Sequence, residues 1–147
     1  MRRRPESEDQ GTVLVLTLGL VGVLLLLVAV VVDVSVVVLA KRAVASAADG
    51  AALAAAQSLD EQALYAGGLT EQAPLSAPLV AETVRAYAAE AAAGQPDLQL
   101  TGTVDGGQTA TVVASRVVAL PFAGRLGIDQ VTVTSIATAR APLTPIG

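Results

Sequence analysis

The stretch "TVLVLTLGLVGVLLLLVAVVV" (Thr12–Val32) decides the fold of this chain. Its 21 residues carry no charge, and a helix of that length, at about 1.5 Å per residue, spans roughly 30 Å. That distance equals the hydrocarbon thickness of a bilayer, where a lone segment must satisfy all its backbone groups internally. The sequence therefore predicts a membrane-spanning helix, despite the many valines.

A cleaved signal peptide is the rival interpretation. Arginines at positions 2–4 precede the apolar run, and Ala45-Ser46-Ala47 resembles a cleavage site. The apolar part of a signal peptide, however, is only about 7–15 residues long. We therefore expect an uncleaved signal anchor over residues 12–40, with a cleaved, secreted protein as the alternative.

The basic residues that flank the span predict its orientation. Three arginines lie before it, and Lys41 and Arg42 follow it. Because basic residues favour the cytoplasmic side, residues 1–11 are expected inside and the C-terminal domain outside the cytoplasmic membrane.

Small residues follow a 3-4 spacing along one face of the span. Gly19, Gly22 and Ala29 share this face with Asp33. Small residues allow close approach by a second helix, although glycine and alanine are common in any such helix. Asp33 either reaches water at the membrane interface or contacts a Lys, an Arg or the backbone of a partner helix.

An alanine-rich segment at residues 41–66 continues the helix beyond the membrane, because alanine is the best helix former. A stripe of apolar residues there predicts the face that packs on the downstream domain. Its members are Val44, Ala48, Ala51, Ala55 and Leu59. Gly67-Gly68 and Pro74 then predict a loop over residues 67–77.

A second helix is expected at residues 78–94, because Pro78 suits a first helical turn and Gly94 with Pro96 marks an end. Its apolar face is predicted to comprise Val80, Val84, Tyr87, Ala88 and Ala91.

Three strands are expected within residues 97–141, where β-branched residues dominate. Asp105-Gly106-Gly107-Gln108 is a hairpin signal, and Leu98, Leu100 and Val104 alternate with polar residues. The last two strands alternate imperfectly, so their buried face stays open. Arg116 and Arg140 are expected to be exposed strand charges, and Tyr65, Tyr87 and Phe122 are the only large side chains available to fill a core.

Together these segments predict an α+β fold. A long N-terminal transmembrane helix continues into an alanine-rich helix, and a second helix and a small three-stranded antiparallel sheet follow. We expect a cytoplasmic N-terminus at residues 1–11, the membrane anchor at 12–40 and the alanine-rich helix at 41–66. A loop at 67–77, the second helix at 78–94, the strands at 97–141 and a tail at 142–147 follow.

The composition argues against catalysis. The chain has no Cys and no His, which excludes thiolate metal sites and the usual catalytic triads. Residues 41–147 carry six Lys/Arg and nine Asp/Glu, a net −3 without a basic patch. No nucleotide-binding or nucleophile motif is present. We therefore predict no enzyme, cofactor, metal, nucleic acid or small-molecule substrate.

The segment "VVVDVSVVVLAKRAVASAADGAALAAA" (residues 30–56) resembles the N-terminal segment of TadE/TadG-like proteins of tight-adherence (Flp) pilus assembly. In that family a membrane helix runs into "VDxG", a basic residue and an "AADAAALA"-type stretch. Asp33, Arg42 and Asp49 occupy the corresponding positions. The C-terminal strand, Pro-containing loop and strand are also similar, and chains of this size from actinobacteria often show the pattern.

The resemblance implies a pseudopilin-like, single-pass accessory component of a pilus or related secretion apparatus. Its partners would be the membrane, other subunits and possibly a second copy. Pilin-type cleavage after Gly11 would place Leu16 where a Glu is required, so an anchored assembly factor fits better. The main alternative is an anchored extracytoplasmic binding or sensory module, which a ligand-sized pocket would favour.

Overall fold

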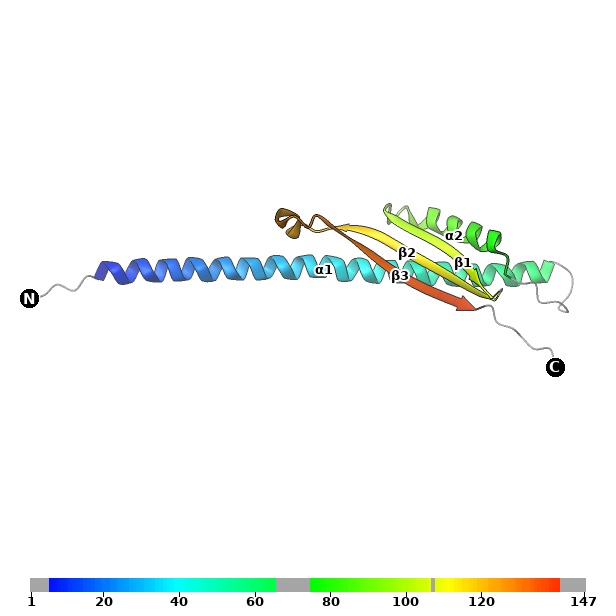
Figure 1. Cartoon of the computed structure of the whole chain (residues 1–147), viewed down its shortest axis with the longest axis horizontal. Helices are drawn as coiled ribbons and strands as arrows, with labels where there is room; N and C mark the ends of the chain where they lie inside the picture. Colours follow the sequence, from blue (N-terminus) through cyan, green and yellow to red (C-terminus); the bar gives the residue numbers. More distant parts are fainter. Residues whose placement is uncertain (1–5, 66–74, 107, 141–147) are drawn as a thin grey trace, which may run out of the picture.

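A single long helix organises the molecule (Figure 1). The computed structural model describes residues 6–65, 75–106 and 108–140. Helix α1 (Glu6–Tyr65) is 60 residues long. It is followed by α2 (Ala77–Ala91), β1 (Leu98–Asp105), β2 (Thr109–Ala119), the short 3-10 helix η1 (Ala123–Leu126) and β3 (Gln130–Arg140). The α+β fold predicted from the sequence is confirmed.

Helix α1 passes from the apolar run into the alanine-rich segment without a break. Proline, which would interrupt a helix interior, does not occur within it, and the many alanines of its C-terminal half favour helix. The other elements pack along its C-terminal half, while the N-terminal half projects alone (Figure 1).

The core lies between α1 and the sheet. Val44, Ala48, Ala51 and Ala55 are completely buried, which confirms the stripe expected to face the domain; the side chain of its fifth member, Leu59, lies outside the described part. Ala40, Ala47, Ala52 and Ala56 widen the buried face. Because these side chains are so small, the helix can lie close to the strands.

The sheet has the order β1-β2-β3, with both pairs antiparallel. Gly102, Val112 and Ala137 pair across its three strands, and cross-strand partners point to the same face. Both α1 and α2 cover that face. The opposite face is rich in threonine and is largely exposed. The predicted turn joins β1 to β2, where Gly106 has a φ of 58° and the Gln108 N–H donates to the Asp105 carbonyl at 3.3 Å.

Helix α2 packs against β1 and against α1 at two glycines. A Cβ at Gly102 would lie 2.8 Å from Val84 Cγ2, and a Cβ at Gly50 would meet the Tyr87 hydroxyl. Val80 and Val84 are buried, as the predicted face of this helix requires. The glycines therefore allow α2 to approach both of its neighbours closely.

Two expectations about side chains were wrong. Phe122 does not fill the core, because it is 46% exposed in the loop that holds η1. Arg116 is not an exposed strand charge: it is half-buried on the helix-facing side of β2, and its buried Nε atom has no hydrogen-bond partner among the described residues. Arg140 is exposed, as expected.

Candidate functional site

The N-terminal half of α1 presents apolar side chains on all sides. From Gly11 to Val32 every residue is exposed except the half-buried Ala29. Among the described residues, α1 is the one helix long and apolar enough to cross a membrane. An uncovered apolar surface of this length is unfavourable in water, and a bilayer would cover it.

Two of the residues predicted to pack against another helix, Gly19 and Gly22, lie on this uncovered part, whereas Ala29 and Asp33 are half-buried. A Cβ built on Gly19 or Gly22 meets no atom within 4 Å. No other described residue therefore uses the close approach that these glycines permit. Contact between a second helix and Gly19, Gly22, Ala29 or Asp33 stays a prediction.

Asp33 has a partner within its own chain. Its Oδ1 accepts a hydrogen bond from the Phe122 backbone N–H at 3.1 Å, and its Oδ2 accepts one from the Ala123 N–H at 2.7 Å. These donors lie at the start of η1, where backbone N–H groups have no partner within the helix. The carboxylate at the end of the apolar run thus fixes the loop between β2 and β3 against α1.

That loop, residues 120–129, is closed by its own backbone. The Leu120 N–H donates to the Asp129 carbonyl at 3.0 Å, and the Ile128 N–H donates to the Ala123 carbonyl at 3.1 Å. Gly127 ends η1 with a φ of 89°, a conformation that favours glycine. The loop is therefore a structured tip of the sheet.

No sequence signal connects Asp33 with this loop. The residues that hydrogen-bond are 89 and 90 positions apart, and the acceptor is a single carboxylate. The sequence predicts a loop that contains Pro and Gly, but it does not indicate which residue accepts hydrogen bonds from the backbone N–H groups of this loop. Covariation between related sequences is the kind of signal that identifies such a contact.

Arg42 and Asp49 lie on the side of α1 away from the sheet. Together with Ser46, Leu53 and Gln57 they form an exposed ridge at 3-4 spacing, which we call the outer ridge. Leu53 is 55% exposed. Because none of these side chains contributes to the buried core, the outer ridge is free to contact another molecule.

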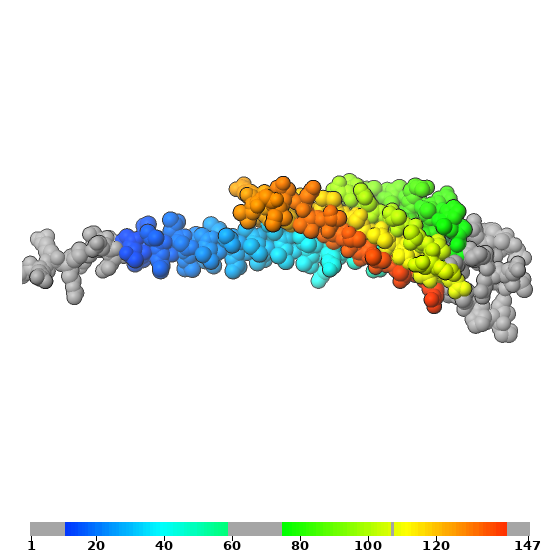
Figure 2. Space-filling model, in the orientation of Figure 1, coloured from blue at the N-terminus to red at the C-terminus, as the bar shows by residue number. Residues whose placement is uncertain are grey.

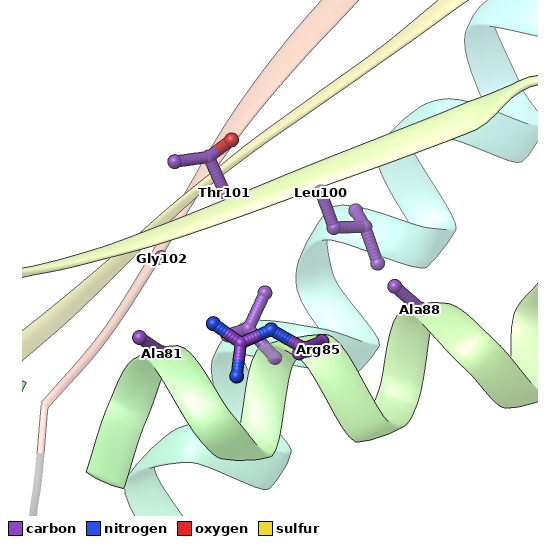
Figure 3. Close-up of a pocket in the computed structure, with 7 residues that line it drawn as sticks. Ala81, Arg85, Ala88, Leu100, Thr101 and Gly102 are labelled. Atoms are coloured by element: carbon purple, nitrogen blue, oxygen red, sulfur yellow. The ribbon is translucent and has the colours of Figure 1, made fainter. Parts of the chain in front are cut away.

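The hollow between α2 and β1 is small (Figure 3). It has a volume of about 190 Å³, and its lining includes Ala81, Val84, Arg85 and Leu100. Binding pockets for small molecules typically measure about 300–1,000 Å³. This hollow does not favour the alternative of an extracytoplasmic binding module.

Residues 11–58 match the family described as "Putative Flp pilus-assembly TadE/G-like". This segment is TadE/G-like. The match confirms the resemblance seen in the N-terminal segment. The resemblance of the C-terminal strands and the actinobacterial type stay predictions. No curated protein and no solved structure gives a significant match to the chain.

The TadE/G-like segment covers most of α1. It includes the uncovered apolar half, Asp33, and the outer ridge with Arg42 and Asp49. The strands and α2 lie outside the match. The TadE/G-like segment and the apolar helix together fit a membrane-anchored component of pilus assembly.

Proposed function

We propose that this protein is a pseudopilin-like accessory component of a Flp pilus or a related secretion apparatus, which acts as a scaffold. Residues 12–32 would span the cytoplasmic membrane once, with the N-terminus inside and the folded domain outside. The role would be structural, which the match of residues 11–58 to a pilus-assembly family supports. Partners would include other subunits and possibly a second copy of the chain.

The observation that supports this proposal most directly is the continuity of α1. One helix of 60 residues runs from the apolar segment through the core of the folded domain. A partner that binds the apolar half therefore acts on the same rigid element that holds the sheet. Such a coupling suits a protein whose task is to position other subunits.

Two surfaces are available for those contacts. Within the membrane, Gly19 and Gly22 leave space for a neighbouring helix. Outside it, the outer ridge offers a basic and an acidic group two turns apart, at Arg42 and Asp49. The opposite charges suit a partner surface of mixed charge, and both residues lie within the segment that matches the family.

The proposal is tested by changing the small-residue face of the anchor. Gly19→Leu and Gly22→Leu each add four carbon atoms and would prevent close approach, so crosslinking to neighbouring subunits in membranes should fall several-fold. Val28→Phe and Val31→Phe, which also add four carbons but lie on the other side of the helix, are the controls and should crosslink normally. Unchanged crosslinking of both glycine variants would refute packing through this face.

A further inference from the structure

The loop of residues 120–129 lies where the bare and covered parts of α1 meet. Its hydrogen bonds to Asp33 place it one residue beyond the uncharged stretch Thr12–Val32, at the single charge within the predicted anchor of residues 12–40. Figure 1 shows η1 at the end of the sheet that points toward the N-terminal half of α1, and Figure 2 shows the loop resting there on the helix. If the apolar run spans the bilayer, this loop is held at the bilayer surface.

Three large apolar side chains of this loop are exposed in the part of the chain that the structure describes. Leu126 is 84% exposed, Ile128 is 56% exposed and Phe122 is 46% exposed. They lie close together in sequence and directly beside a lipid-sized apolar surface. Exposed to water, these side chains would lower the solubility of the protein. At a membrane surface they would extend the apolar area with which the anchor contacts lipid.

The backbone of the loop suits a partly dehydrated setting. The N–H groups of residues 120, 122, 123, 124, 125, 127 and 128 donate hydrogen bonds to the loop or to Asp33. Pro121 has no N–H to satisfy. Lipid-exposed irregular backbone is not tolerated in the hydrocarbon core, so the loop belongs in the headgroup layer above it.

We propose that residues 120–129 form a membrane-surface contact, in which Phe122, Leu126 and Ile128 enter the headgroup layer beside the end of the anchor. The inference rests on the membrane anchoring proposed above. Arg125 and Asp129 give the loop one charge of each sign. Apolar burial is therefore the driving force, and binding does not require anionic lipid.

The test uses tryptophan fluorescence, because the chain has no Trp of its own. Full-length single-Trp variants are reconstituted in vesicles of neutral phosphatidylcholine brominated either near the headgroup or deep in the acyl chain. Leu126→Trp reports on the loop. Val23→Trp lies within the apolar run, and Ile136→Trp lies on the exposed face of β3, where it is 67% exposed. Ile136 is six residues beyond the start of β3, about 20 Å along the strand.

We expect blue-shifted emission from Leu126→Trp and stronger quenching by the shallow bromine than by the deep one. Val23→Trp should be quenched most by the deep bromine, and Ile136→Trp should not be quenched. Vesicles with added anionic lipid should give the same result for the loop.

Several outcomes would overturn the inference. Red, unquenched emission from Leu126→Trp beside a quenched Val23→Trp would show that the loop stays in water while the anchor is inserted. Blue but unquenched emission would show that a second copy covers the loop. Failure of Val23→Trp to be quenched would instead refute the anchoring itself. Ile128→Trp repeats the loop measurement if Leu126→Trp does not fold.

Discussion

At the scale of single residues, Asp33 is the group that connects the anchor to the sheet. Its two carboxylate oxygens accept hydrogen bonds from the backbone N–H groups of Phe122 and Ala123 at the start of η1. Hydrogen bonds to a charged acceptor contribute about 1.5–3 kcal/mol each when made inside a protein. Asp33 is half-buried, so the lower part of that range applies.

Replacing Asp33 with alanine should therefore loosen the loop. We expect a loss of about 1–3 kcal/mol in the free energy of unfolding in detergent, and faster tryptic cleavage after Arg125, detected by mass spectrometry. Asp33→Asn keeps one acceptor oxygen and should give an intermediate rate. Ser35→Ala is the control, because the Ser35 hydroxyl donates to the Val31 carbonyl of its own helix. Equal cleavage in Asp33→Ala and the control would contradict the role given to this carboxylate.

At the scale of elements, the close contact between α2 and β1 depends on Gly102, which has no side chain. A methyl group at Gly102 would press on the β-branched Val84, which has little freedom to move.

Gly102→Ala should destabilise the folded domain by about 1–3 kcal/mol, the usual effect of overpacking. Thermal unfolding followed by circular dichroism measures it. Gly94→Ala is the matched control, because a Cβ there meets nothing within 4 Å, and its stability should be unchanged or slightly higher. A Gly102→Ala protein as stable as the control would show that α2 does not pack tightly on β1.

Periodicity in the sequence predicted the helices, the alternation of β1 and the buried stripe of α1, because each reflects local geometry. The same reasoning failed at Arg116, since apolar residues occur on both faces of β2 from Val112 to Val118 and alternation gives no unique side. It also missed the bond between Asp33 and the loop, which only the tertiary fold brings together. The conformation of η1 was not predicted, because its four residues are too few to show a period.

At the scale of the whole molecule, the orientation across the membrane is the central prediction. We expect a maleimide that cannot cross membranes to label Gln99→Cys, and not Ser7→Cys, in cells stripped of their wall. The absence of native cysteines removes background labelling. Both variants should be labelled after permeabilisation, and the intact mass should show no cleavage after Gly11 or within residues 45–47. The reverse labelling pattern would place the domain in the cytoplasm. A mass that shows cleavage within residues 45–47 would replace the anchor with a signal peptide, and one that shows cleavage after Gly11 would indicate pilin-type processing.

The unbroken helix also gives the molecule the mechanics of a lever. Its part beyond Asp33 is about 48 Å long at 1.5 Å per residue. Membrane helices tilt by about 20° on average, and a rotation of that size about Asp33 would carry the far end through about 16 Å. The sheet packs along the part of α1 beyond Asp33, and the loop of residues 120–129 is held at Asp33. A small change of helix packing in the lipid would therefore become a large displacement of the domain.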